Sequence, residues 1–292
     1  MSLKICGKLL NMRDARILVV DDDPDIHVLL ASILKNAGFQ MDSAFNGIEG
    51  LERLQSGAYN LVLTDVRMPG MDGLELLQRI HERRPSTPVV VMTADNTAEN
   101  LIHSIREKAF SYFSKPFSSA AVVEMVERAL EKPAESDDIE VLSARPGWIV
   151  LQLRCKLDVA DRLLQFLSEL PFEVLTEEKD NIATAFRELL VNAIEHGGRL
   201  DPEQKVEVAY IRLSQAILYY IRDPGKGFSF DNLAHAAVSS TPENPFGHME
   251  VRTQAGMRPG GFGILMSRQI ADELVYNEKG NQVLLVKYLN HR

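Results

Sequence analysis

The sequence contains little cysteine and no long hydrophobic run. Its two cysteines, Cys6 and Cys155, are far apart among 292 residues and form neither a metal-binding nor a disulfide pattern. Such cysteine usage suits a reducing compartment, so we expect a cytoplasmic protein. No apolar stretch approaches the roughly 20 residues that a membrane-spanning helix needs, and we expect no membrane association.

The sequence also has fewer basic than acidic residues. The 32 lysines and arginines are outnumbered by 41 acidic residues, and the net charge of −9 argues against direct DNA binding as the main function. No low-complexity segment is present, and 45% apolar and 25% charged residues are typical of globular proteins. The length predicts about two domains. Residues 1–14 lack a signal-peptide pattern, and we interpret them as a leader for which disorder is one alternative.

The first half, residues 15–132, alternates apolar segments with amphipathic ones. The stretch from Asn60 to Gly73 shows the pattern: an apolar run ends at Asp65, and a turn rich in proline and glycine follows. A continuous apolar run bounded by turn signals indicates a buried parallel strand. Five such strand–helix units predict a doubly wound α/β domain with a five-stranded parallel, flavodoxin-like sheet.

Polar residues stand at the predicted carboxyl ends of four strands. Asp21 and Asp22 end the first strand, Asp65 the third, Thr93 the fourth and Lys115 the fifth. Ligands bind at this edge of a doubly wound sheet. Three converging carboxylates suit Mg²⁺, which would also neutralise a phosphoryl group arriving at Asp65. Thr93 can donate a hydrogen bond to that group, and Lys115 can pair with it as a point charge.

These residues resemble the response-regulator receiver family in order and spacing. The matching segments are Val19–Asp22, Asp65 with the turn through Gly73, Met92–Ala94 and Lys115–Phe117. The resemblance implies that Asp65 is the phosphoacceptor, that Thr93 and Tyr112 form a switch pair, that an upstream histidine kinase is a partner, and that the receiver can form a homodimer. One departure is Lys108, where the family usually has glycine. The segment His81–Pro85 resembles a histidine-kinase phosphorylation box, but we predict a solvated helix end.

The second half, residues 146–292, follows a polar, acidic segment. Residues 133–145 lack the apolar heptads of a coiled coil, and we interpret them as a linker. Strands and helices then alternate irregularly, with two β-branched segments that can pair through the turn at Ser214 and Gln215. This order predicts an α+β sandwich with helices on one side of a mixed sheet.

Three segments of this half carry polar or glycine patterns suited to a nucleotide. On one predicted helix, carboxylate, amide and imidazole side chains recur every four residues and so share a face. An aspartate followed by glycines ends a strand, and a glycine-rich turn opens a later helix, whose bare N–H groups suit phosphates. In chain order these residues are Glu188, Asn192, His196, Asp223, Gly225, Gly227, Gly261 and Gly263.

Taken in this order, the three segments resemble the histidine-kinase-type ATPase family, and more narrowly its anti-sigma-factor serine/threonine kinase branch. The resemblance implies that ATP and Mg²⁺ are bound, with Asn192 on Mg²⁺, Asp223 on adenine and the glycines near phosphates. It makes Glu188 the candidate general base and residues 230–259 the ATP lid. The branch assignment depends on the absence of a phosphoacceptor-histidine hairpin, the strand–helix entry at 148–167, and the His196–Gly197 pair.

Three functions follow for the whole chain. The first is a response regulator in which phosphorylated Asp65 controls an ATP-dependent serine/threonine kinase that acts on an anti-sigma antagonist or captures a sigma factor. The second is a partner-switch module that binds ATP and sequesters a protein without phosphoryl transfer. The third, a histidine-kinase fragment that phosphorylates itself, lacks the histidine-bearing helices and ranks last.

Overall fold

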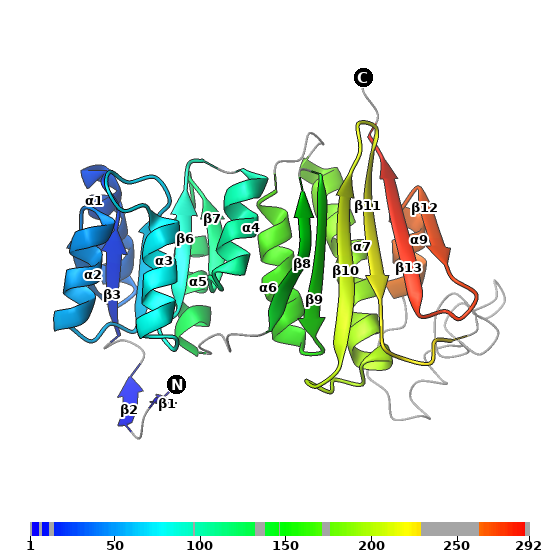
Figure 1. Cartoon of the computed structure of the whole chain (residues 1–292), viewed down its shortest axis with the longest axis horizontal. Helices are drawn as coiled ribbons and strands as arrows, with labels where there is room; N and C mark the ends of the chain where they lie inside the picture. The colour runs from blue at the N-terminus through cyan, green and yellow to red at the C-terminus, as the bar shows by residue number, and fades with distance from the viewer. Residues whose placement is uncertain are drawn as a thin grey trace. The chain divides into compact units, whose positions relative to one another are not determined.

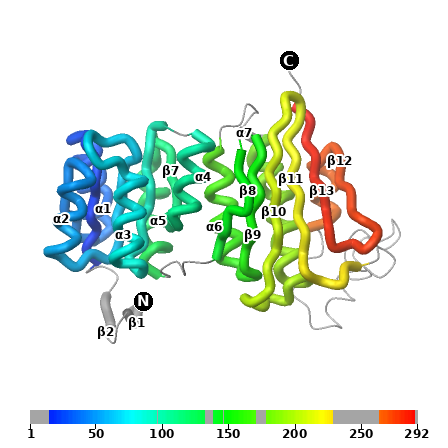
Figure 2. Tube along the Cα trace, in the orientation of Figure 1, coloured from blue at the N-terminus to red at the C-terminus, as the bar shows by residue number. Residues whose placement is uncertain are grey.

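The described part of the chain folds into two units. The computed structural model describes residues 2–5, 8–11, 15–95, 97–131, 138–145, 147–170, 176–228 and 263–289. The first unit consists of the chain up to Asp138 with the short segment that starts at Gln165, and the second unit consists of the rest. Most of the first unit is therefore coloured blue to cyan and most of the second green to red (Figure 2). Within the leader, β1 (Ser2–Ile5) pairs antiparallel with β2 (Lys8–Asn11).

The first unit is the predicted α/β domain, in which strands and helices alternate (Figure 1). Its five strands pair in parallel in the order β4-β3-β5-β6-β7, which agrees with the predicted doubly wound sheet. In chain order its elements are β3 (Arg16–Val20), α1 (Pro24–Asn36), β4 (Gln40–Ala44), α2 (Gly47–Ser56), β5 (Leu61–Asp65), α3 (Gly73–Arg83), β6 (Val89–Thr93), α4 (Ala98–Arg106), β7 (Ser111–Ser114) and α5 (Ser119–Glu131).

Apolar residues bury this sheet on both faces. Every residue of β5 and β6 is buried, because helices cover both sides of a parallel sheet. Local signals start the helices where the sequence predicts: Asp23 caps α1 by accepting from the Asp25 N–H, and Pro24 occupies the first helical position. The strand ends are thereby fixed, and the polar residues that follow them share one edge.

The second unit is an α+β domain with a six-stranded sheet in the order β12-β13-β11-β10-β9-β8. Helices α6, α7 and α9 lie on one face of the sheet (Figure 1). Its elements are β8 (Ile139–Arg145), β9 (Trp148–Arg154), α6 (Leu157–Ser168), α7 (Thr176–Asn192), η2 (Ala193–Gly197), β10 (Lys205–Arg212), β11 (Ala216–Arg222), α9 (Gly263–Ile270), β12 (Glu273–Tyr276) and β13 (Gln282–Tyr288).

Three expectations for this half need correction. The sheet is not mixed, since all five of its described pairings are antiparallel. Residues 139–145 are not linker but form β8, an edge strand on β9 with a register shift between Val141 and Ser143. An edge strand needs backbone pairing on one side only and tolerates polar side chains, which is why this segment resembles a linker. The helix predicted to carry Glu188, Asn192 and His196 is not α-helical throughout. After Asn192 it continues as a π-helical turn, η2, and the Gly198 N–H donates to the Ala193 carbonyl.

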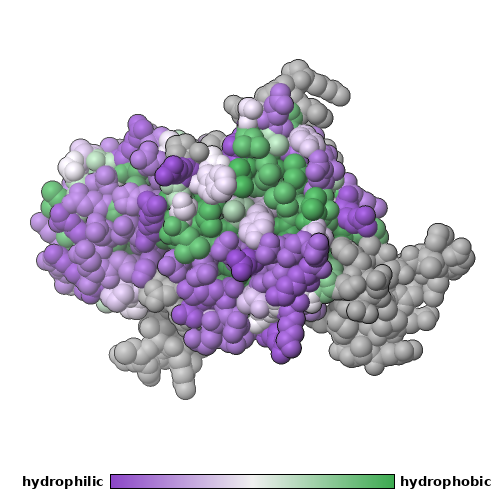
Figure 3. Space-filling view, turned by 45° about the vertical axis from the view of Figure 1, so that its right-hand side comes forward, coloured by the Kyte–Doolittle hydropathy of each residue, from purple (hydrophilic) through white to green (hydrophobic). Residues whose placement is uncertain are grey.

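The face of this sheet opposite the helices has an apolar band at one end. Strand register aligns two rows of side chains across it, and the next row is polar, with Glu207 beside Arg222. Figure 3 shows hydrophobic side chains gathered over these strands above hydrophilic ones. Trp148 and Val275 in the band are 50% and 51% exposed, whereas Ala209 and Val286 are 6% exposed, so the band meets solvent mainly at these two residues. The band consists of Trp148, Ile211, Leu218 and Val286 in one row and Val150, Ala209, Tyr220, Leu284 and Val275 in the other.

Candidate functional site

The first site lies at the carboxyl edge of the parallel sheet and brings together three of the predicted side chains. The Lys115 Nζ lies 2.7 Å from Asp21 Oδ2 and 2.7 Å from Asp65 Oδ1. Asp21 and Asp65 are 0% and 5% exposed, and Thr93, at the end of the neighbouring strand, is 1% exposed. Asp22 is exposed, and within the described ranges no three acidic, histidine or cysteine side chains gather as a metal cluster.

Burial and charge act in opposite directions on this group. Burial raises the pKa of Asp65, and neighbouring Asp21 raises it further, against the lowering effect of Lys115. Burial alone would lower the pKa of Lys115, but its hydrogen bonds to Asp21 and Asp65 outweigh that effect and raise it. Lys115 therefore stays charged and stabilises the two carboxylates between which it lies. The Arg67 N–H also donates to Asp65 Oδ2 at 2.6 Å.

The donor set is compatible with Mg²⁺. Two buried carboxylates that already share one cation offer hard oxygen ligands, and Mg²⁺ in proteins commonly takes one or two carboxylates and completes its shell with water. Asp21 and Asp65 would hold the ion, and Asp22, the next residue, stays a predicted third ligand. Lys115 would then give up part of its contact with the carboxylates to a bound ion or phosphoryl group.

Asp95 is a residue that the sequence analysis missed. Its N–H donates to Thr93 Oγ1 at 3.0 Å, and its carbonyl accepts from the buried Tyr112 hydroxyl at 3.3 Å. Its carboxylate accepts from Arg67 Nε at 2.8 Å and from Asn100 Nδ2 at 3.1 Å. The two predicted switch residues thus meet through Asp95, which also reaches the loop after Asp65. Burial, followed by the Asp95 charge, raises the pKa of Tyr112, so this hydroxyl keeps its proton.

The second site is a cavity of about 920 Å³ in the α+β domain. That volume suits a nucleotide-sized ligand. All the predicted nucleotide-site residues that the structure describes line it: Glu188 and Asn192 from α7, His196 from η2, Asp223, Gly225 and Gly227 after β11, and Gly263 at the start of α9. Gly261 and the predicted lid, residues 230–259, lie outside the described residues.

Asp223 is partly buried on the wall of this cavity and held from both sides. Its Oδ1 accepts from the Gly225 N–H at 2.7 Å, and its own N–H donates to the Asn281 carbonyl at 3.0 Å. Burial raises the pKa of Asp223, although the Gly225 N–H and nearby Lys279 lower it. A fixed carboxylate in this position can accept a hydrogen bond from an amino group such as that of adenine.

Glycines leave room for the polar groups of this cavity. A Cβ at Gly197 would lie 2.3 Å from Asp223 Cγ, and one at Gly263 would lie 2.7 Å from Glu188 Oε2. Gly225 is equally confined, since its Cβ would lie 2.7 Å from Asp223 Oδ1. Gly197 escaped the sequence analysis as a site residue, although its place directly after His196 was noticed. Only the fold brings it against a residue 26 positions further along the chain.

Comparison with known families matches each half to one family. Residues 17–127 match the model of the response regulator receiver domain, and residues 154–287 match that of the histidine kinase-like ATPase domain. The chain is a receiver domain joined to a histidine kinase-like ATPase domain. The receiver resemblance and the fold class of both halves are thereby confirmed, and the narrower anti-sigma branch stays a prediction.

Curated relatives match about two fifths of the chain. The DNA-binding transcriptional regulator NtrC of Escherichia coli K12 is 41% identical over 119 residues, which is 41% of this chain and 25% of that protein. The transcriptional regulatory protein GlrR of the same organism is 33% identical over 126 residues, 43% of this chain and 28% of that protein. The chain spans about a quarter of the length of these relatives. A receiver domain structure from Methanospirillum hungatei is 32% identical, covers 40% of this chain and 94% of its own, and has a TM-score of 0.39.

In the described residues, no helix is both long and apolar enough to cross a bilayer.

Proposed function

We propose that this chain is a response regulator that accepts a phosphoryl group on Asp65 from an upstream histidine kinase. The observation that supports the proposal is the Lys115 ammonium bridging Asp21 and Asp65 at 2.7 Å from each. In the transfer, an Asp65 carboxylate oxygen attacks the phosphorus of a phosphohistidine. The new O–P bond forms an acyl phosphate, the P–N bond breaks, and the released imidazole nitrogen keeps the electron pair of that bond and takes up a proton from solvent.

The neighbours of Asp65 have separate roles in this step. Lys115 favours the ionised, nucleophilic carboxylate and then pairs with a phosphoryl oxygen. Bound Mg²⁺ would neutralise charge on the phosphoryl group, with Asp21, Asp22 and Asp65 as its protein ligands. The Thr93 hydroxyl would donate to a phosphoryl oxygen, and its link to Tyr112 through Asp95 would carry the change to the buried ring.

Phosphorylation can be tested on the full chain with acetyl phosphate as donor. We expect one phosphoryl group per chain by intact mass in the presence of Mg²⁺, and none in Asp65→Asn. Lys115→Ala should take up the group much more slowly. Phosphorylation of Asp65→Asn to the wild-type extent would contradict the assignment.

We further propose that the ATPase domain is an ATP-dependent serine/threonine kinase whose substrate is a small anti-sigma antagonist protein. Glu188 and Asn192 lie one turn apart on α7 and line the same cavity as Asp223, which supports the proposal. The Asn192 side chain would bind Mg²⁺ and Asp223 the adenine amino group. Glu188 would take the proton of the substrate hydroxyl. The hydroxyl oxygen would then bond to the γ-phosphorus of ATP while the bond from that phosphorus to the ADP oxygen breaks.

A second candidate function is capture of a protein partner, such as a sigma factor, without phosphoryl transfer. The apolar band on the outer face of the second sheet favours it, because it exposes Trp148 and Val275, and exposed apolar surface is characteristic of protein-binding sites. Incubation of the full chain with labelled ATP and a candidate antagonist separates the two functions. Acid-stable phosphoserine on the partner, lost in Glu188→Gln, would support the kinase. A stable ATP-dependent complex with no label on the partner would support capture.

A further inference from the structure

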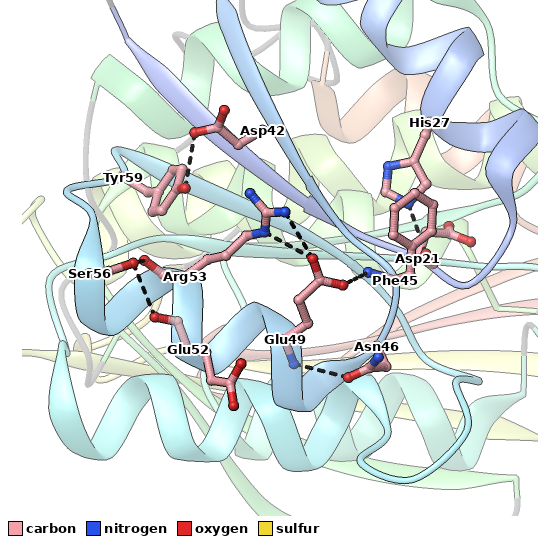
Figure 4. A network of polar contacts seen from close by, with 10 residues as sticks. All are labelled: Asp21, His27, Asp42, Phe45, Asn46, Glu49, Glu52, Arg53, Ser56 and Tyr59. Atoms are coloured by element: carbon pink, nitrogen blue, oxygen red, sulfur yellow. Dashed lines mark hydrogen bonds and ion pairs between the residues drawn. The ribbon is translucent and has the colours of Figure 1, made fainter.

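His27 lies in the second turn of α1, next to the acidic edge of the receiver. It is 6% exposed, and its Nε2 lies 2.8 Å from the carbonyl oxygen of Asp21 (Figure 4). Asp21 is a carboxylate of the proposed magnesium site, but this contact involves its main chain. Neither the composition nor the strand-end pattern drew attention to His27.

The hydrogen bond places a proton on one of the two ring nitrogens. A carbonyl oxygen only accepts, so the His27 Nε2 carries the proton and donates. Nδ1 is buried and has no hydrogen-bond partner in the described part of the chain. Packing therefore orients the ring: the Phe45 ring lies 4.5 Å away at an angle of 50°. Figure 4 shows the Phe45 ring beside the imidazole, close to the Asp21 contact.

Asp21 is held by partners from several elements. Its N–H donates to the Ala44 carbonyl at 3.1 Å, and its Oδ1 accepts from the Asp23 N–H at 3.0 Å. Lys115 takes Oδ2, and His27 takes the carbonyl. Of these four partners, His27 is the one in α1, so its hydrogen bond ties the helix to the loop that carries Asp21 and Asp22. Removing it would leave the carbonyl of a residue with 0% exposure without this partner.

Phe45 has a clear role in this arrangement. It is 45% exposed, and its ring packs on one side against the imidazole of His27. Its position directly after β4 is fixed by its own N–H, which donates to Glu49 Oε2 at 2.8 Å. The side chain of Glu49 is held in turn by Arg53, one helical turn further along α2. Phe45 thus lies on a loop held by Glu49, with its ring beside the imidazole that makes the hydrogen bond to Asp21.

We propose that His27 is a positioning residue for the magnesium and phosphoryl site. Its Nε2–H fixes the Asp21–Asp22 peptide, and with it the direction of the two carboxylates that precede α1. The Phe45 ring packs beside the imidazole that makes this hydrogen bond. Groups that orient metal ligands in this way commonly change metal affinity about 10- to 100-fold when they are replaced. The inference rests on the proposed Mg²⁺ site.

Two substitutions separate the hydrogen bond from the packing. In His27→Gln the amide nitrogen occupies about the position of Nε2 and can donate to the Asp21 carbonyl, but the ring is lost. In His27→Phe the ring contact with Phe45 is kept and the donor is lost. We would titrate Mg²⁺ into the full chain by calorimetry without nucleotide, with Asp65→Asn as the background, and record thermal unfolding of each variant without Mg²⁺.

We expect His27→Phe to bind Mg²⁺ about tenfold more weakly or worse, and His27→Gln to stay within about threefold of the wild type. Equal affinity of His27→Phe and the wild type would overturn the inference, and so would equal loss in both folded variants. If His27→Phe fails to unfold cooperatively, His27→Leu replaces it as the variant without the donor, and wild-type Mg²⁺ affinity in that variant would equally overturn the inference. Mg²⁺ binding that is absent from the wild type, or equal in the wild type and Asp65→Asn, would contradict the proposed Mg²⁺ site itself and with it the role of His27.

Discussion

The carboxylate of Asp223 lies directly against the backbone of Gly197. A Cβ at residue 197 would lie 2.3 Å from Asp223 Cγ, too close for any native contact. The π-helical turn η2 carries Gly197 into this position from the end of α7. Any side chain at 197 must therefore displace the group proposed to recognise adenine.

Gly197→Ala should accordingly weaken ATP binding. We expect a loss of about tenfold or more, because a hydrogen bond to a charged group contributes about 1.5–3 kcal/mol. Nucleotide affinity of the full chain, measured by calorimetry, checks this. Gly57→Ala is a suitable control, since its Cβ would lie 3.0 Å from the Tyr59 ring and 3.3 Å from the Arg53 carbonyl oxygen and so is also crowded, but in the receiver and away from the nucleotide cavity. An unchanged affinity in Gly197→Ala would show that Asp223 does not contact the base.

The stability of the receiver should depend on pH through Asp65. Its pKa is raised in the folded state, mainly by burial, so the folded form binds this proton more tightly than the unfolded form. Ionisation then reduces stability as pH rises from the unfolded value of about 3.9 through the raised folded value, with no further loss above it. Asp65→Asn cannot ionise and lacks this loss. The free energy of unfolding of the variant, relative to that of the wild type, should therefore increase as pH rises between the two pKa values.

For Asp42→Asn, the free energy of unfolding relative to the wild type should decrease as pH rises. Burial raises the pKa of Asp42, but hydrogen bonds from Arg16 and Tyr59 outweigh this and lower it. Its ionised form therefore stabilises the fold above the unfolded pKa, and this contribution is lost as pH falls through the lowered folded pKa. Urea unfolding of both variants from pH 3 to 8 measures the two trends. Parallel curves would show that neither carboxyl is coupled to folding.

Lys108 adopts a backbone conformation that favours glycine. Its φ is 61°, in the left-handed region, just after α4. Glycine adopts this conformation without the steric cost that lysine has, but it also makes the unfolded chain more flexible, which opposes folding. Because the first effect is the larger, Lys108→Gly should stabilise the domain by about 0.5–1 kcal/mol. Glu107→Gly, where φ is −80°, should destabilise it instead. Thermal unfolding compares the pair, and a stabilised Glu107→Gly would contradict this explanation.

Much of the fold could be predicted from local sequence. The strands that end at Val20, Asp65 and Thr93 are apolar runs followed by turn residues, and parallel pairing brings their ends to one edge. Strand β8 could not be predicted in the same way. Its residues alternate only weakly in polarity, and their conformation depends on pairing with β9.

The missed site residues depend on contacts between distant segments. Asp95 matters because the chain brings it to Thr93, Tyr112 and Arg67 at once. Gly197 matters because of what lies opposite it, and no property of the His196–Gly197 pair alone reveals Asp223. Motifs predict residues that carry chemistry, whereas residues that position them are identified from the fold.

The measurement that tests the central claim most directly is ATP affinity before and after phosphorylation of Asp65. The full chain would be treated with acetyl phosphate and Mg²⁺, and nucleotide affinity compared with that of the untreated chain and of treated Asp65→Asn. A response regulator with an ATP-dependent output predicts a change of at least about fivefold, the lower end of typical coupling between sites, in the wild type alone. Tight ATP binding that is identical in all three samples would contradict control of the ATP site by Asp65.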